Sequence, residues 1–208
     1  MWFSFSTNIL TLLAGVLLYL YIQGEGVNIY LRRFLLWTGI SAGIAAFGHL
    51  EILPNELQKY LLVLSRILNV LSIFFFAYGS LQVFDYSKNS VIRIASIIVF
   101  GVCLVWLVYL NVQMPGAKES FIPVIIYGII GMILIGGVSF AINLTMNLRA
   151  HGGVILGVFL IGVSAVVFKL IPETDGIKPS DISHILIAIA LVFMTLGFKN
   201  LKLNEINS

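Results

Sequence analysis

The chain has 208 residues, of which 60% are hydrophobic and 10% are charged, whereas a soluble domain carries about 25% charged residues. This composition excludes a water-soluble globular protein. The 12 basic and 9 acidic residues give a formal net charge of +3, which is too small to indicate a nucleic-acid partner. Seven membrane helices of about 20 residues each would occupy about 140 residues, so a single transmembrane domain, residues 1–208, accounts for the chain.

Seven apolar runs follow one another along the chain, each closed by charged, Gly, Pro or Asn residues. No Lys or Arg precedes the first run, which predicts a retained helix rather than a secretory signal. The runs lack the alternating pattern of barrel strands, and helices are the other structure that spans a bilayer. The sequence therefore predicts an all-α, seven-transmembrane-helix bundle. Its predicted spans, in chain order, are about 4–23, 34–53, 57–82, 90–111, 120–143, 151–171 and 181–198.

The orientation of the bundle follows from the distribution of charge, because cytoplasmic loops carry an excess of Lys and Arg. The side that holds the C-terminus receives seven basic residues (Arg32, Arg33, Lys88, Arg93, Arg149, Lys199, Lys202) and three acidic ones (Glu25, Asp85, Glu205). The other side receives five basic residues (Lys59, Arg66, Lys118, Lys169, Lys178) and six acidic ones (Glu51, Glu56, Glu119, Glu173, Asp175, Asp181). The bias predicts a cytoplasmic C-terminus and an N-terminus outside the cell.

Glycines recur at the spacing that lets membrane helices approach closely. The G-x-x-x-G pairs are Gly39 with Gly43 and Gly153 with Gly157. Gly128, Gly131, Gly136 and Gly137 crowd the fifth predicted span. The first interpretation is packing between helices of one chain, and the second is a homodimer formed through these Gly-rich faces.

Polar side chains are rare within the spans, and those capable of chemistry gather in the outer half of the predicted bundle. Because such residues are costly in lipid, they mark candidate functional positions. The third histidine, His151, stands alone near the cytoplasmic end and is expected at the membrane interface. The members of the outer group are His49, Glu51, Arg66, Asn69, Lys169, Asp181 and His184.

Three members of this group form a candidate metal site. Asp181 and His184 are three residues apart and share one helix face. Together with His49 they would supply two imidazoles and a carboxylate, which suffices for zinc with an open fourth position. Two other interpretations stay open: structural pairing between helices, in which Asp181 caps its own helix, and haem held by the two histidines.

Arg66 stands about ten residues into the third predicted span, roughly 15 Å along the helix. A planar guanidinium binds a carboxylate or phosphate bidentately, so the residue predicts an anionic ligand. Glu51, Asn69 and Lys169 complete that candidate ligand-binding set. The alternative is a fixed link between Arg66 and a carboxylate of the chain, Asp181 or Glu51.

The pattern F-G-H-L around His49 and S-D-I-S-H around His184, in a seven-span chain with an outside N-terminus, resembles the superfamily of alkaline ceramidases and adiponectin-receptor-like proteins. The resemblance implies a zinc-dependent lipid amidohydrolase with these two histidines as metal ligands. It covers the architecture of the whole chain but only about a dozen residues of motif.

Two functions are thus in view for an integral protein of the plasma membrane that contacts membrane lipid. One is an outward-opening, zinc-dependent hydrolase of a lipid amide or ester. The other is a non-catalytic membrane protein that binds a lipid or small anion, or serves as a subunit of a membrane complex.

Overall fold

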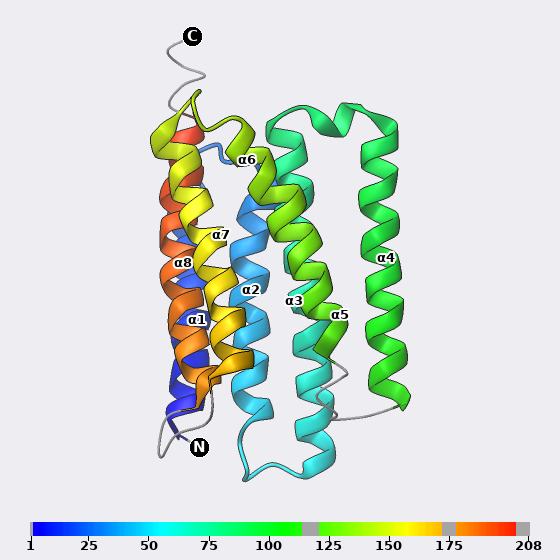
Figure 1. The fold of residues 1–208 in the computed structure, drawn as a ribbon. Helices are drawn as coiled ribbons and strands as arrows, with labels where there is room; N and C mark the ends of the chain where they lie inside the picture. Colours follow the sequence, from blue (N-terminus) through cyan, green and yellow to red (C-terminus); the bar gives the residue numbers. More distant parts are fainter. Residues whose placement is uncertain (1, 114–120, 172–177, 203–208) are drawn as a thin grey trace.

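The computed structural model describes residues 2–113, 121–171 and 178–202, and every regular element in these residues is a helix. The chain runs α1 (Trp2–Tyr21), α2 (Ile29–Gly48), α3 (Asn55–Val83), the short 3-10 helix η1 (Tyr86–Lys88), α4 (Ser90–Gln113), α5 (Ile122–Tyr127), η3 (Gly128–Gly137), α6 (Val138–Ile142), α7 (Leu148–Leu170) and α8 (Pro179–Lys202). Because α5, η3 and α6 are continuous, the elements form seven long columns, which stand side by side (Figure 1). The all-α prediction is confirmed. Lys118, Glu119, Glu173, Asp175 and Glu205, counted in the charge bias, lie outside the described residues.

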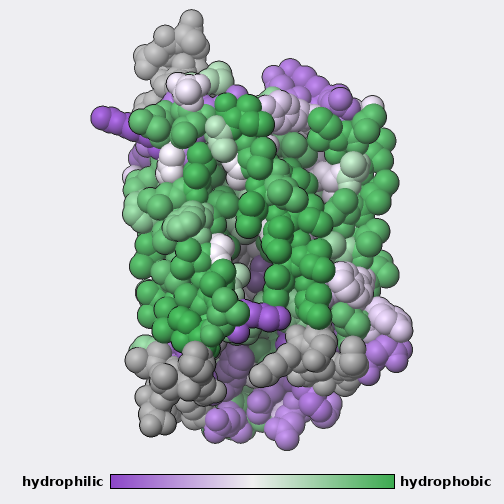
Figure 2. Space-filling view, viewed as in Figure 1, coloured by the Kyte–Doolittle hydropathy of each residue, from purple (hydrophilic) through white to green (hydrophobic). Residues whose placement is uncertain are grey.

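Successive columns run in opposite directions, so α1 begins at the lower end of Figure 1 and α8 ends at the upper end. We call the lower end, where α1 and α8 both begin, the N-terminal end. The upper end, where α2 and α7 begin, is the C-terminal end. Figure 2 shows that the flank between the two ends is mostly hydrophobic, while purple, hydrophilic atoms gather toward the ends.

The second helix differs most from its prediction, since it covers Ile29–Gly48 and not 34–53. Asn28 starts it five residues earlier, because its Oδ1 accepts a hydrogen bond from the main-chain N–H of Tyr30 at 2.9 Å. The helix ends at Gly48. His49 and Glu51 therefore lie in the turn between α2 and α3, not inside a span.

Six described helical segments are long and apolar enough to cross a membrane: Phe3–Tyr21, Asn55–Val83, Ser90–Gln113, Ile122–Ile142, Leu148–Leu170 and Pro179–Leu201. The column missing from this group is α2. It packs against α1 and α3, and ten of its 20 residues are buried. A helix that is covered by protein has less need of an apolar surface than one that faces lipid, so its composition alone does not decide whether it spans the bilayer.

Glycines bring the helices on one side of the bundle into backbone contact. A Cβ added to Gly15 of α1 would lie 2.7 Å from the Cα of Gly39 on α2, and one added to Gly153 of α7 would lie 3.2 Å from the Cα of Gly197 on α8. Gly43 and Gly157, the partners in the two G-x-x-x-G pairs, also lie against α1 and α8 of the same chain. These contacts are the intramolecular packing expected first, whereas the homodimer stays a prediction.

The fifth column contains an unusual helix, because η3 is a ten-residue π-helix and π-helices rarely exceed a single turn. Two of its glycines receive large side chains of α3: an added Cβ at Gly131 would meet Ile73 at 2.6 Å, and one at Gly136 would meet Phe76 at 2.1 Å. Phe76 is fully buried and packs against the rings of Phe34 and Phe140. The glycines of η3 thus leave room for Phe76, whose ring packs at the centre of the core.

Candidate functional site

A polar cluster occupies the N-terminal end of the bundle, where α1 packs against α8. Ser4, Thr7, Asn8 and Thr11 form one buried stripe along α1 at helical spacing. The Thr11 hydroxyl donates to the main-chain oxygen of His184 at 3.0 Å. Sequence reasoning missed this stripe, although four small polar residues at i, i+3, i+4 and i+7 in an apolar segment are the signal that could have found it.

The bond from Thr11 also sets the register of the two helices. Both α1 and α8 run from the N-terminal end to the C-terminal end (Figure 1). Because Thr11 is level with His184, the residues three positions earlier, Asn8 and Asp181, are level with each other. The predicted pair Asp181 and His184 therefore lies at the level of Asn8, a residue of α1 that the sequence did not single out.

Three buried polar atoms in this cluster have no hydrogen-bond partner among the described residues. They are Asn8 Oδ1, Asp181 Oδ1 and His184 Nδ1. The other oxygen of Asp181 accepts from the main-chain N–H of Lys178 at 3.0 Å, while the whole residue is only 1% exposed. A buried polar atom without a partner costs free energy, so this part of the bundle has acceptor atoms that the described residues leave unpaired.

His49 lies beside this cluster, at the end of α2. It is near enough to Asp181, Lys178 and Arg66 to interact with them electrostatically, and His184 interacts in the same way with His49 and Asp181. Burial of the imidazole lowers the pKa of His49 most. The positive charge of Lys178 lowers this pKa further, and the negative charge of Asp181 raises it. Part of the ring still reaches solvent, so His49 lines the edge of the cluster.

Arg66 lies near the cluster, close enough to His49 for an electrostatic interaction, but its side chain bonds to α4. Its Nη1 donates to Asn111 Oδ1 on α4 at 2.8 Å, and its guanidinium carbon lies 5.7 Å from the centre of the Phe121 ring. The Asn111 amide in turn donates to the Leu107 carbonyl of its own helix at 2.8 Å. The sequence predicted a carboxylate or an anionic ligand for Arg66 and missed Asn111, whose signal was an amide in the last turn of an otherwise apolar helix.

The remaining predicted residues do not join the cluster. Glu51 is exposed in the turn after α2, Asn69 is half-buried on α3, and Lys169 is exposed in the last turn of α7. Among the described residues, no group of three or more His, Cys, Asp or Glu side chains is placed to hold a metal ion. The set of His49, Asp181 and His184 is therefore not assembled as a zinc site, and the zinc and haem hypotheses stay untested predictions.

A cavity of about 470 Å³ lies at the opposite, C-terminal end, lined in part by Asn28, Gln82, Asn147 and His151. Its amides are largely paired: Asn28 donates to Gln82 Oε1 at 3.0 Å, and the Asn147 amide donates to the Asn200 carbonyl at 3.1 Å. His151 is 4% exposed and bonds through Nδ1 to the Asn143 carbonyl. The rings of Phe84 and Phe140 cover His151, and its expected position at the level of the membrane interface stays a prediction.

Comparisons with known proteins place the chain in a family without assigning it an activity. No curated protein and no solved structure matches it at a significant level. One family profile, described as a family of unknown function, DUF6962, matches residues 4–203. The match includes nearly all of every helical column, and the chain therefore belongs to the DUF6962 family.

Proposed function

We propose that the chain is a seven-span protein of the plasma membrane, with its N-terminus outside and its C-terminus in the cytoplasm, that binds a small cation in the polar cluster between α1 and α8. Support for the seventh span is the position of α2 within the bundle, beside six helices of spanning composition. Support for the orientation is the placement of Arg32, Arg33 and Lys88 at the C-terminal end.

The single observation that carries the ligand proposal is the buried carboxylate of Asp181, one oxygen of which receives no hydrogen bond. A carboxylate removed from water is costly unless a donor or a positive charge meets it. Asn8 Oδ1 is a second acceptor in need of a donor at the same level of the bundle. Two such oxygens favour a cation over the anion expected from Arg66, which faces α4.

A hydrolase is the rival function, because His49, Asp181 and His184 interact electrostatically and match the positions implied by the ceramidase-like resemblance. The two functions differ in what Asp181 requires. A metal hydrolase needs the carboxylate together with both histidines, whereas the cation site needs the carboxylate and Asn8. Substitutions at these positions therefore separate them.

The test measures the thermal midpoint of the purified full-length chain in detergent, in NaCl, in methylammonium chloride and in choline chloride at equal ionic strength. We expect Na⁺ or methylammonium to raise the midpoint above the value in choline, since choline is too large and has no N–H donor. Asp181→Asn and Asn8→Leu should abolish the difference. Asp85→Asn is the matched control, because Asp85 is an exposed carboxylate at the other end of the bundle.

Two results would overturn the proposal. One is a wild-type midpoint that is equal in all three salts, which would mean that the Asp181 carboxyl is protonated and structural. The other is one zinc per chain by metal analysis, lost in His49→Ala and His184→Ala, which would establish the hydrolase in its place.

A further inference from the structure

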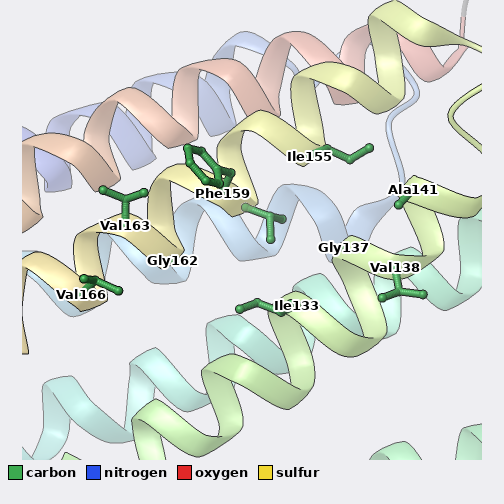
Figure 3. A pocket seen from close by; sticks show the side chains of 10 residues that line it. Ile133, Gly137, Val138, Ala141, Ile155, Phe159, Gly162, Val163 and Val166 are labelled. Atoms are coloured by element: carbon green, nitrogen blue, oxygen red, sulfur yellow. The ribbon is translucent and has the colours of Figure 1, made fainter.

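An apolar groove of about 510 Å³ runs along the outside of the bundle between α7 and the column formed by η3 and α6. Figure 3 shows its two walls: Ile155, Phe159 and Val163 project from α7, and Ile133 and Val138 project from the facing column. No polar side chain lines it. In Figure 2 the same seam is hollowed, with hydrophilic atoms at its lower end.

Small residues create this space. Gly162 lies on the wall formed by α7, and a Cβ added there would meet no atom within 4 Å. Gly137 and Ala141 lie on the facing wall. On the other side of α7, in contrast, Gly153 and Gly157 are filled by α8. Gly153 and Gly157 thus allow α8 to approach α7 closely, whereas Gly162 leaves open space beside the helix.

The groove has the length of one membrane leaflet. Its lining on α7 extends from Ile155 to Val166, which is eleven residues or about 17 Å at 1.5 Å per residue. Half of a hydrocarbon layer roughly 30 Å thick is about 15 Å. A single extended acyl chain would therefore fill the groove from the headgroup level to the middle of the bilayer.

A positive charge stands at the outer end of this groove. Ile155, Phe159, Gly162 and Val166 repeat every three or four residues, and the next position in the series is Lys169. Lys169 is exposed in the last turn of α7, and the described residues supply no carboxylate in ion-pair contact with it. A lysine ammonium at this level attracts the negative charge of a headgroup phosphate.

We propose that this groove binds one anionic phospholipid, with an acyl chain along α7 and the headgroup phosphate at Lys169. The site is separate from the polar cluster between α1 and α8, and it holds whether or not that cluster binds a cation. The occupant is a lipid and not a second chain, because the groove is one acyl chain long and ends near Lys169, for which the described residues supply no ion-pair carboxylate.

Native mass spectrometry of the full chain in detergent micelles tests the site, with phosphatidylglycerol and phosphatidylcholine of identical acyl chains as probes. We expect one phosphatidylglycerol per wild-type chain at lipid concentrations where phosphatidylcholine binds about fivefold more weakly, the effect of one lysine near a headgroup. Lys169→Gln should remove this preference and leave binding of phosphatidylcholine unchanged.

The groove itself is tested by Gly162→Leu, because an added Cβ meets no atom within 4 Å and the longer side chain would occupy the groove. This variant should lose both lipids while its thermal midpoint stays that of the wild type. Gly101→Leu is the matched control, because an added Cβ on α4 also meets no atom within 4 Å. Equal binding of the two lipids by the wild type, or retention of phosphatidylglycerol by Gly162→Leu, would overturn the proposal.

Discussion

The side of the bundle built from α1, α2, α7 and α8 is packed much more closely than the side that carries α4. Ten of the 20 residues of α2 are buried, whereas four of the 24 residues of α4 are. Backbones touch at Gly15 and Gly39 on the close side, while Gly101 of α4 faces open space. Close packing of these helices therefore depends on small residues at their interfaces and not on apolar content, because α4 is the most apolar of the six candidate spans but has few buried residues.

The two sides also treat their polar groups differently. On the close side, the cluster around Asp181 leaves buried polar atoms without partners. On the open side, the hydrogen bond between Arg66 and Asn111 joins α3 to α4. The bond between Arg66 and Asn111 therefore helps to hold α4 against α3, although Ser96 Oγ of α4 and the Tyr127 hydroxyl are also buried without a partner among the described residues.

The largest expected effect comes from breaking the close side at its tightest point. In Gly15→Val, the new Cβ would lie 2.6 Å from the Leu35 carbonyl oxygen and 2.7 Å from the Gly39 Cα. Backbone atoms cannot yield as a flexible side chain can, so we expect a loss of about 3 kcal/mol in unfolding free energy. Gly101→Val should change the unfolding free energy by less than about 0.5 kcal/mol, because valine has a higher helix propensity than glycine. Denaturant unfolding in mixed micelles gives both values, and equal losses would contradict the comparison.

The next effect concerns the link on the open side. Asn111→Leu removes the acceptor of Arg66 Nη1 and leaves that donor half-buried, so we expect a loss of about 2 kcal/mol. Because α4 has few other buried residues, proteolysis of the turn around η1 should accelerate as well. Asn89→Leu, in the exposed cap of the same helix, is the comparison variant. A fully stable Asn111→Leu chain would show that apolar packing alone holds α4.

A smaller effect is expected where α1 meets α8. Thr11→Val preserves the shape of the side chain and removes its bond to the His184 carbonyl. Single hydrogen bonds between membrane helices contribute about 0.6 kcal/mol, and we expect a loss of that size in micelle unfolding. The cation response proposed for Asp181 should persist in this variant, since Thr11 supplies register and not a ligand oxygen. Loss of that response would place Thr11 in the site.

The smallest effect is a dependence of stability on pH at the edge of the cluster. The pKa of His49 lies below its ordinary value of 6.5 in the folded chain, so the unfolded chain binds more protons below that pH. The contribution of His49 to the unfolding free energy should therefore be constant above pH 6.5. It should fall as the pH drops below 6.5. Thermal midpoints measured from pH 8 to pH 5 should show a smaller decline for His49→Gln than for the wild type. A steeper decline in His49→Gln would show that His49 does not cause the loss of stability at low pH and would contradict this prediction.

Much of the fold could be predicted because bilayer thickness leaves a strong mark on composition. Five helices begin and end within a few residues of their predicted spans, and α8 continues four residues beyond the predicted end. The second span was displaced because its start depends on a cap at Asn28, and Arg32 and Arg33 made the first turn look like a loop. The π-helix at Gly128–Gly137 was missed, since glycine content predicts close approach but not hydrogen-bond register.

The candidate site was predicted only in part. Asp181, His184 and His49 lie close enough to interact electrostatically, while the metal site predicted from them stays a prediction. Arg66 is at a similar depth but faces α4, and depth alone could not reveal this. Asn8 and Asn111 escaped notice because neither belongs to a motif, and each gains its role from the helix beside it.

Composition and spacing along the chain were enough to predict a helical membrane protein, with glycines spaced for close packing and few polar groups in its spans. Those properties depend on one residue at a time or on spacing within one helix, which the chain order specifies. Only the assembled bundle shows which neighbour each face meets: that α2 packs against α1 and α3, that Asn8 is level with Asp181, and that an apolar groove lies between α7 and the column of η3 and α6. These facts depend on the relative rotation and register of helices, which side-chain packing fixes and no single helix encodes.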